Sequence, residues 1–87
     1  MINLNNVNII LTGATGGIGG AILERLYESS AKIIATGTNE DKLKELGNKF
    51  NNSTTKKFDI TNHESIEKFI DECNEIFENK IDVLINN

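Results

Sequence analysis

Apolar residues form four short runs separated by longer segments with helical spacing. The runs cover residues 7–12, 31–37, 54–60 and 81–86 and are each six or seven residues long. Short runs that are apolar nearly throughout are typical of strands covered on both faces. The third is the weakest, because Lys56 and Lys57 interrupt it. The pattern therefore predicts four buried strands.

The segments between these runs have the spacing of amphipathic helices. In residues 17–28, Ile18, Ile22 and Leu26 recur every four positions, which places them on one predicted inner face. The second segment begins after Thr38 and Asn39, both of which are residue types that cap helices. Its predicted inner face consists of Leu43, Leu46 and Phe50.

The third helix is predicted over residues 61–80. Thr61 followed three residues later by Glu64 matches a capping box. The predicted buried stripe consists of Ile66, Phe69, Ile70, Cys73, Ile76 and Phe77.

Strands that alternate with helices imply a parallel sheet with right-handed crossovers. The order β-α-β-α-β-α-β predicts an α/β fold, the amino-terminal half of a Rossmann-type sheet with strand order 3-2-1-4. Residues 1–87 form one partial domain in this reading. The third helix lies alone on its face and leaves apolar surface exposed, so we expect self-association or a complementary carboxy-terminal segment.

Composition narrows the function classes. The chain has 38% hydrophobic and 25% charged residues with a net charge of −4, which indicates a globular domain and disfavours nucleic acid as a partner. It has no apolar run long enough to cross a membrane and no amino-terminal signal pattern, so we expect a cytoplasmic location. The single cysteine, Cys73, is expected in the core and His63 in solvent, which predicts no metal site.

The segment TGATGGIG follows the first predicted strand and opens the first predicted helix. Gly13 allows a backbone conformation closed to other residues, Gly17 allows close approach of a ligand, and Gly19 allows close packing of helix on strand. A pyrophosphate suits such a loop, and the candidate residues are Thr12, Gly13, Ala14, Thr15, Gly16, Gly17, Ile18 and Gly19. Alternatively, the glycines serve only compact packing. The run also fits two glycine spacings, G-x-x-x-G-x-G and G-x-x-G-x-x-G.

The segments LTGATGGIGGAIL, FDIT and IDVLINN together resemble the short-chain dehydrogenase/reductase family, with bacterial 3-oxoacyl-[acyl-carrier-protein] reductases the most similar type. The resemblance covers all 87 residues but about one third of a family member. It implies that residues 12–19 hold the cofactor pyrophosphate, that Asp59 and the N–H of Ile60 lie at the adenine, and that Asn86 lies near the adenine-side ribose. Asn86 and Asn87 match the start of the family's N-N-A-G motif, which favours the short reductase type over extended members.

The cofactor is expected to be NADP, with NAD possible. An acidic residue at the end of the second strand would bind the ribose 2′-hydroxyl of NAD and repel the 2′-phosphate of NADP. Gly37 and Thr38 stand at this point. The arginine that NADP-binding members often use is missing from Gly16 and Thr38, which leaves the Thr38 hydroxyl and backbone N–H groups as candidates.

No catalytic residue is predicted. The family's catalytic asparagine, serine and Tyr-x-x-x-Lys have no match, since Tyr27 is followed four residues later by Ala31. The leading hypothesis is the cofactor-binding part of an NADPH-dependent 3-oxoacyl reductase of fatty acid synthesis, inactive alone. An acyl-carrier-protein thioester would be a partner only when the remainder is supplied. The alternatives are a non-catalytic nucleotide-binding or assembly module and a gene remnant.

Overall fold

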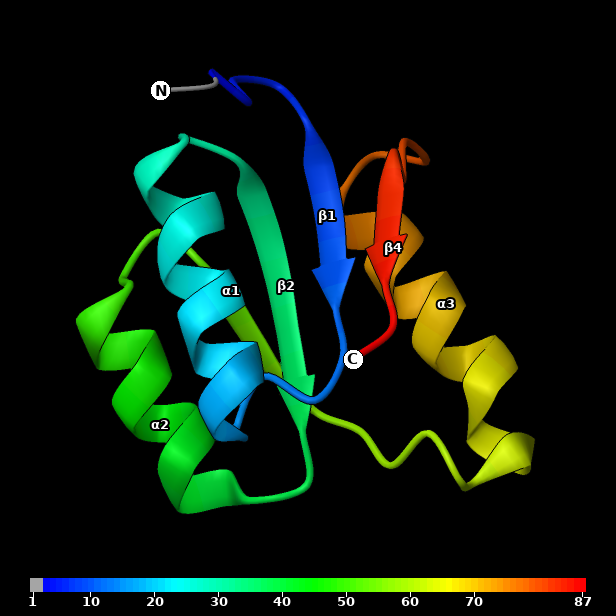
Figure 1. Cartoon of the computed structure of the whole chain (residues 1–87). Coiled ribbons are helices and arrows are strands. Elements are labelled where there is room, and N and C mark those ends of the chain that lie inside the picture. The colour runs from blue at the N-terminus through cyan, green and yellow to red at the C-terminus, as the bar shows by residue number, and fades with distance from the viewer. Residues whose placement is uncertain (1–2) are drawn as a thin grey trace.

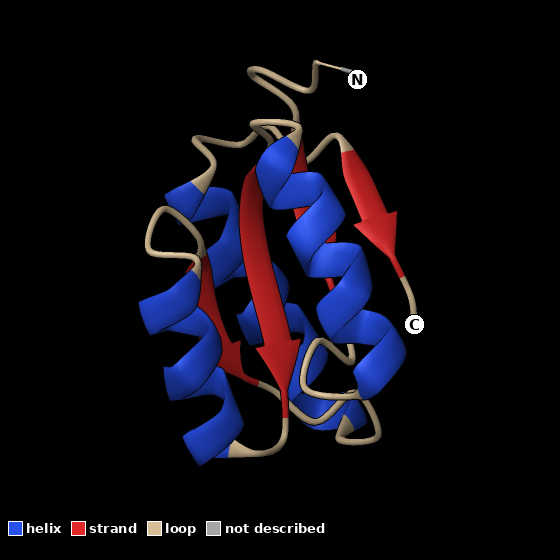
Figure 2. Cartoon of the chain, turned by 60° about the vertical axis from the view of Figure 1, so that its left-hand side comes forward, coloured by secondary structure: helices blue, strands red, loops and turns tan. Residues whose placement is uncertain are grey.

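A four-stranded parallel sheet lies between two layers of helices (Figures 1 and 2). The computed structural model describes residues 3–87. Its elements in chain order are β1 (Asn8–Leu11), α1 (Gly17–Glu28), β2 (Lys32–Gly37), α2 (Glu40–Lys49), β3 (Thr54–Lys57), the 3₁₀ turn η1 (His63–Ser65), α3 (Ile66–Ile76) and β4 (Val83–Ile85).

The strand order is β3-β2-β1-β4, and every pair is parallel. In the centre, Ile10 of β1 is in register with Ile34 of β2 on one side and with Leu84 of β4 on the other. The predicted fold class and strand order are therefore confirmed. Because the strands are parallel, their carboxyl ends meet at one edge of the sheet, where the winding reverses between β1 and β4.

The sheet has a separate apolar core on each face. Successive residues of a strand point to opposite faces, so Leu11 packs with α1 and α2 while Ile10 packs with α3. The buried residues of the first core are Leu11, Ala14, Leu23, Ile33, Ala35 and Phe50. Those of the second core are Ile10, Ile34, Phe69, Cys73 and Phe77.

The third helix is shorter than the predicted 61–80, and the predicted capping box is wrong. The Thr61 hydroxyl and N–H both donate to Oδ1 of Asp59, at 2.6 and 2.9 Å. These two bonds hold Thr61 in a turn with Asp59 outside the helix, and α3 begins only at Ile66. The helix ends at Ile76, just before Glu78 and Asn79, whose positive φ angles are incompatible with a continuing helix.

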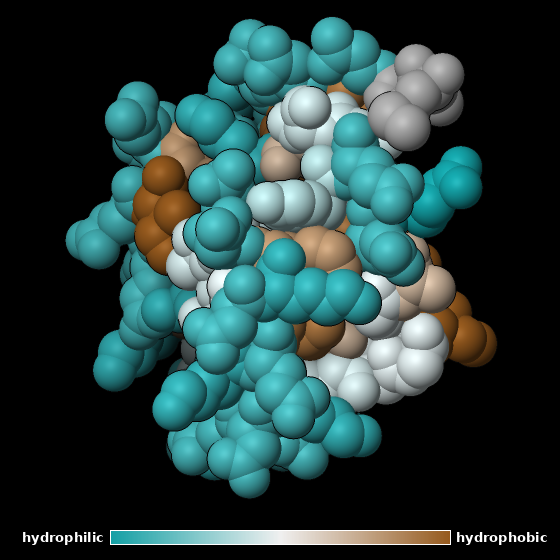
Figure 3. Space-filling model, turned by 90° about the vertical axis from the view of Figure 1, so that its left-hand side faces the viewer, coloured by the Kyte–Doolittle hydropathy of each residue, from teal (hydrophilic) through white to brown (hydrophobic). Residues whose placement is uncertain are grey.

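The predicted inner face of α1 is also partly wrong. Ile18 is 73% exposed, and the buried residues of the helix are Gly19 and Leu23. Ile22 and Leu26 pack against the core only in part. Because α1 meets the preceding loop through Gly19, its contact stripe is rotated away from Ile18. Apolar atoms on the α1 and α2 side lie in separate patches within a mainly hydrophilic surface (Figure 3).

The outer strand β4 is the least covered part of the sheet. One edge of β4 pairs with β1 and the other has no strand beside it within residues 3–87. Leu84, on the α3 face, is 58% exposed, and Val83, on the α1 face, is 39% exposed. The expected exposed apolar surface is present.

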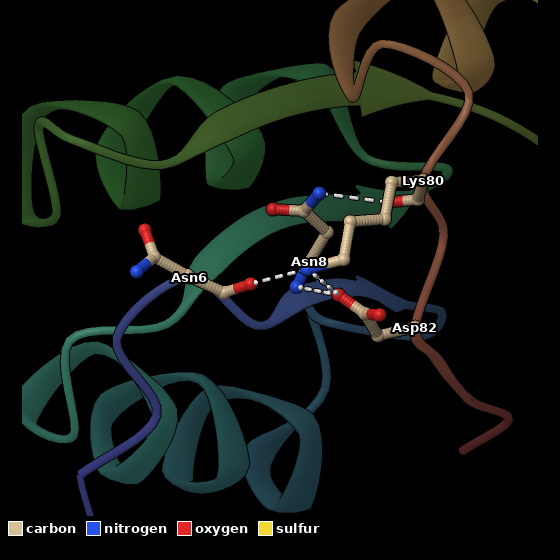
Figure 4. Close-up of polar contacts among 4 residues, drawn as sticks. All are labelled: Asn6, Asn8, Lys80 and Asp82. Atoms are coloured by element: carbon tan, nitrogen blue, oxygen red, sulfur yellow. Dashed lines mark hydrogen bonds and ion pairs between the residues drawn. The ribbon is translucent and has the colours of Figure 1, made fainter.

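Polar contacts join β1 and β4 at their amino ends (Figure 4). The N–H of Asn8 donates to the Asp82 carboxylate at 2.8 Å, and the Asn8 side-chain amide donates to the Lys80 carbonyl at 2.7 Å. The Lys80 ammonium donates to the Asn6 carbonyl at 3.0 Å. These contacts position β4 from the end of the sheet opposite the glycine loop.

Candidate functional site

The glycine loop, residues 12–19, connects β1 to α1 at the carboxyl edge of the sheet. Gly13 has a φ of 65°, in the left-handed region, which a residue with a Cβ adopts at a cost. A Cβ on Gly19 would lie 2.0 Å from the Gly13 carbonyl oxygen. The backbone of the loop therefore requires glycine at both positions.

The backbone does not require glycine at the two positions between them, Gly16 and Gly17. A Cβ on Gly16 would lie 3.7 Å from the Gly13 carbonyl oxygen, an ordinary contact, and a Cβ on Gly17 would have no neighbour within 4 Å. The folded chain has room for a side chain at both positions. Space next to Gly17 is space that a ligand can occupy against the main chain.

The amino terminus of α1 is open to an anion. Its N-cap, Gly16, makes no side-chain cap, and the first turn has no acidic residue. By contrast, Asn39 caps α2, and Glu40 and Asp41 occupy the first turn of that helix. The first N–H groups of a helix have no intrahelical acceptor and carry partial positive charge. Phosphate groups bind at such a terminus.

Asn86 and Asn87, which follow β4, brace the glycine loop. The Thr12 hydroxyl donates to Oδ1 of Asn86 at 3.1 Å and accepts from the N–H of Asn87 at 3.2 Å. The Asn87 side-chain amide donates to the Gly13 carbonyl at 3.1 Å. The family resemblance implied that Asn86 lies near the adenine-side ribose of the cofactor. The contact of Asn87 with the glycine loop was not predicted, because it depends on the pairing of β4 with β1.

The loop also rests against the end of β2. The N–H of Ala14 donates to the Thr36 carbonyl at 2.8 Å, and a Cβ on Gly37 would lie 2.6 Å from the Thr15 methyl carbon. In its present position Thr15 leaves no space for a Cβ at Gly37, so a side chain there would require Thr15 to move.

Thr38, Asp59 and Ile60 lie beyond the carboxyl ends of β2 and β3, and all three are exposed. The Thr61 hydroxyl, and with it the Thr61 N–H, holds the pKa of Asp59 below its ordinary value. Hydrogen bonds to the charged form of a carboxyl group have this effect. Asp59 is thus a carboxylate acceptor at neutral pH, on the segment that runs from β3 to η1 (Figure 1).

A surface cavity of about 440 Å³ lies on the other face of β3, against α3. Its walls include the stacked rings of Phe58 and Phe69, 4.1 Å apart, and the ion pair of Lys56 with Glu72. No glycine-loop residue lines it. The candidate site is therefore assigned to the glycine loop and not to this cavity.

Within residues 3–87, no three His, Cys, Asp or Glu side chains are grouped to hold a metal ion. Cys73 is fully buried on the inner face of α3, and burial raises the pKa of its thiol to about 11. A neutral, inaccessible thiol is neither a ligand nor a nucleophile. None of the helices in this part of the chain is both long and apolar enough to span a membrane.

Comparison with known proteins agrees with this arrangement. A family model described as short chain dehydrogenase matches residues 7–87. The chain is 39% identical to a 3-oxoacyl-[acyl-carrier-protein] reductase FabG of Rickettsia bellii over 88 aligned positions, which are 100% of this chain and 34% of the relative. It is 34% identical to an uncharacterized oxidoreductase of Staphylococcus aureus (strain USA300), covering 88% of this chain and 34% of that protein.

The fold has a counterpart among solved structures. A short chain dehydrogenase from Bacillus anthracis superimposes with a TM-score of 0.85 at 30% identity, covering 94% of this chain and 35% of that chain. The chain spans about one third of the length of the relatives that it matches. The match begins before β1 and includes all the elements described above.

Proposed function

Because the chain belongs to the short chain dehydrogenase family, we propose that residues 12–19 bind the pyrophosphate of a nicotinamide dinucleotide. The observation that carries the proposal is the open amino terminus of α1. It has no side-chain cap and no acidic residue, and Gly17 has free space where a Cβ would stand. The proposed role of the chain is cofactor binding in an oxidoreductase.

The proposed cofactor is NADP, and two features support it over NAD. Position 37 is a glycine and carries no acidic side chain, and the next residue is the uncharged Thr38. An acidic residue at the end of β2 would favour the 2′-hydroxyl of NAD. Asp59 and Ile60 are proposed at the adenine, and Asn86 near the ribose that follows it.

The proposed reaction of the complete protein is reduction of a 3-oxoacyl thioester on an acyl carrier protein. A bound NADPH supplies a hydride for the 3-carbonyl. The residues of this chain hold the dinucleotide, while the remaining two thirds of the relatives' length would supply the acid that protonates the oxygen. No Tyr-x-x-x-Lys occurs in these 87 residues, so we expect binding without turnover by this chain alone.

Substitutions at Gly17 test the pyrophosphate site. Gly17→Asp adds a side chain where the fold has room and an acidic group that a helix amino terminus favours, so the chain should stay folded. The same carboxylate would occupy and repel the phosphate position. We expect the amide signals of residues 12–20 to shift with millimolar NADP⁺ in the unsubstituted chain and to stay unmoved in the Gly17→Asp variant.

Gly20→Ala is the matched control, since its Cβ would lie 3.8 Å from the Ala14 carbonyl oxygen, an ordinary contact. It should retain the full NADP⁺ response. Equal responses of the Gly17→Asp variant and the Gly20→Ala variant would contradict the proposed site.

A further inference from the structure

Lys57 is the last residue of β3 and lies beside the end of β2. The two strands pair in parallel, with Gly37 in register with Lys57. The next N–H along, that of Phe58, donates to the Gly37 carbonyl at 3.0 Å. The register thus brings a lysine one strand away from the residue at which a dinucleotide-binding sheet meets the adenine-side ribose.

The Lys57 side chain lies on the same face of the sheet as α1 and α2. Thr55 faces α2, because a Cβ on Gly47 would lie 3.5 Å from the Thr55 hydroxyl oxygen. Residues two apart in a strand share a face, so Lys57 points the same way. Lys56 points to the opposite face, where it pairs with Glu72 of α3.

The ammonium group of Lys57 has a partner that is easily exchanged. Its Nζ lies 3.4 Å from Oε1 of Glu40, the first residue of α2, and the two side chains are 58% and 73% exposed. Exposed ion pairs contribute little free energy. A phosphate dianion at the end of β2 would compete effectively with one solvated carboxylate.

Residues 12–20 and Thr38 are uncharged, and Lys56 is directed to the other face. Charge-assisted hydrogen bonds to phosphate are stronger than neutral ones. A lysine at this position therefore discriminates between a ribose with a 2′-phosphate and one with a 2′-hydroxyl.

We infer that Lys57 binds the 2′-phosphate of NADP(H) and sets the cofactor preference of this site, with Glu40 opposing it. The inference rests on the proposed function, since it requires the dinucleotide to lie along residues 12–19. It assigns cofactor discrimination to β3, in place of an arginine in the glycine loop or after β2. It also explains how a loop without any charge can select the more negative cofactor.

The test compares 2′,5′-ADP with 5′-AMP, which differ only in the 2′-phosphate. Binding to the full 87-residue chain is measured by amide shifts, together with NAD⁺ as a probe of the glycine loop. We expect 2′,5′-ADP to bind about fivefold more tightly than 5′-AMP, as one partly solvated charge pair allows. The Lys57→Met variant should bind the two nucleotides equally, and the Lys57→Arg variant should keep the fivefold ratio of affinities. The Glu40→Gln variant should have a higher ratio.

Lys56→Met is the matched control, because it makes the same charge change at the adjacent position on the other face. It should leave the ratio unchanged. The ratio should also fall as salt rises to about 0.5 M in the unsubstituted chain and stay flat in the Lys57→Met variant, because salt screens exposed charges. Circular dichroism confirms that each variant is folded.

Two different failures are distinguishable. If NAD⁺ and both nucleotides leave residues 12–20 unmoved, the proposed function is contradicted, and this inference with it. If NAD⁺ binds there while the two nucleotides bind equally, or while the Lys57→Met variant keeps the unsubstituted ratio, only the inference about Lys57 is overturned.

Discussion

Among single residues, the five glycines of residues 13–20 divide by physical role. Gly13 and Gly19 are required by the backbone itself, through a positive φ and a contact of 2.0 Å that a Cβ would make. Gly16, Gly17 and Gly20 are not, and glycine within a helix, as at Gly17 and Gly20, lowers its stability relative to alanine. Of these three, Gly16 and Gly17 lie on the surface proposed for the cofactor.

Gly19→Ala is expected to destabilise the chain by about 3 kcal/mol, because its Cβ would overlap a backbone oxygen that cannot move without shifting the loop. Gly20→Ala is the control, with an ordinary contact of 3.8 Å, and should not lower the free energy of unfolding, because alanine is favoured over glycine inside a helix. Urea unfolding measures both. Equal values for the two variants would contradict the role of Gly19 as the point of contact between α1 and its loop.

Cys73 should make the stability fall at alkaline pH. Burial raises the pKa of this thiol to about 11 in the folded chain, whereas the unfolded thiol loses its proton near its ordinary value of about 8.5. Between these values the unfolded state binds fewer protons, so the free energy of unfolding decreases as pH rises.

The decrease should reach about 3 kcal/mol by pH 11. Cys73→Ala removes the titrating group and should flatten this part of the pH profile, even though the cavity lowers stability at neutral pH. Parallel profiles for the two proteins in urea titrations from pH 7 to 11 would refute the assignment.

At the level of the element, the helix caps show where a local sequence pattern predicts a helix end correctly and where it does not. Either Thr38 or Asn39 was a possible cap for α2, and the structure selects Asn39, whose Oδ1 accepts from the Lys42 N–H at 3.0 Å. For α3 the capping box failed, because Thr61 bonds to Asp59 behind it in the chain. A cap motif identifies a helix end only when its residue is not already held in a local turn by another side chain.

Asn39→Ala is expected to lower the stability of the chain by about 1 kcal/mol, the usual cost of removing an N-cap. Thr38→Ala, one residue earlier, should leave it nearly unchanged, because no cap bond is lost. Thermal unfolding followed by far-ultraviolet circular dichroism compares the two. A larger loss for the Thr38→Ala variant would show that the cap is assigned to the wrong residue.

In the whole molecule, the least covered part of the sheet is the flank formed by β4. Within residues 3–87, β4 has an unpaired edge and exposes Leu84 and Val83 on its two faces. Exposed edge strands with apolar side chains pair readily with other chains. We expect the proposed partner segment, or a second copy of the chain, to contact this flank.

Leu84→Lys should reduce self-association of the chain, because it places a charge on the exposed edge strand. Asn52→Lys, an exposed turn residue between α2 and β3, makes a comparable charge change away from β4 and should have no effect. Sedimentation over a range of micromolar concentrations measures the assembly state. If both variants associate like the unsubstituted chain, the β4 flank is not the contact surface.

The order of the elements, their parallel arrangement and the glycine loop were determined by the sequence alone, since hydrophobic period and turn chemistry act over a few residues. The strand order was predicted from the doubly wound arrangement that this alternation matches. Within the loop, the requirement for glycine at positions 13 and 19 was predictable for the same reason.

The tertiary structure decided which distant groups meet. Asn87 reaches Gly13, Thr15 occupies the space beside Gly37, and Lys57 comes to lie beside Gly37. None of these follows from local patterns, because each depends on strand register between segments far apart in the chain. The exposure of Ile18 likewise depends on how closely α1 approaches its loop. The proposed cofactor site is thus formed by local chain geometry, and the selectivity proposed for it depends on the assembled sheet.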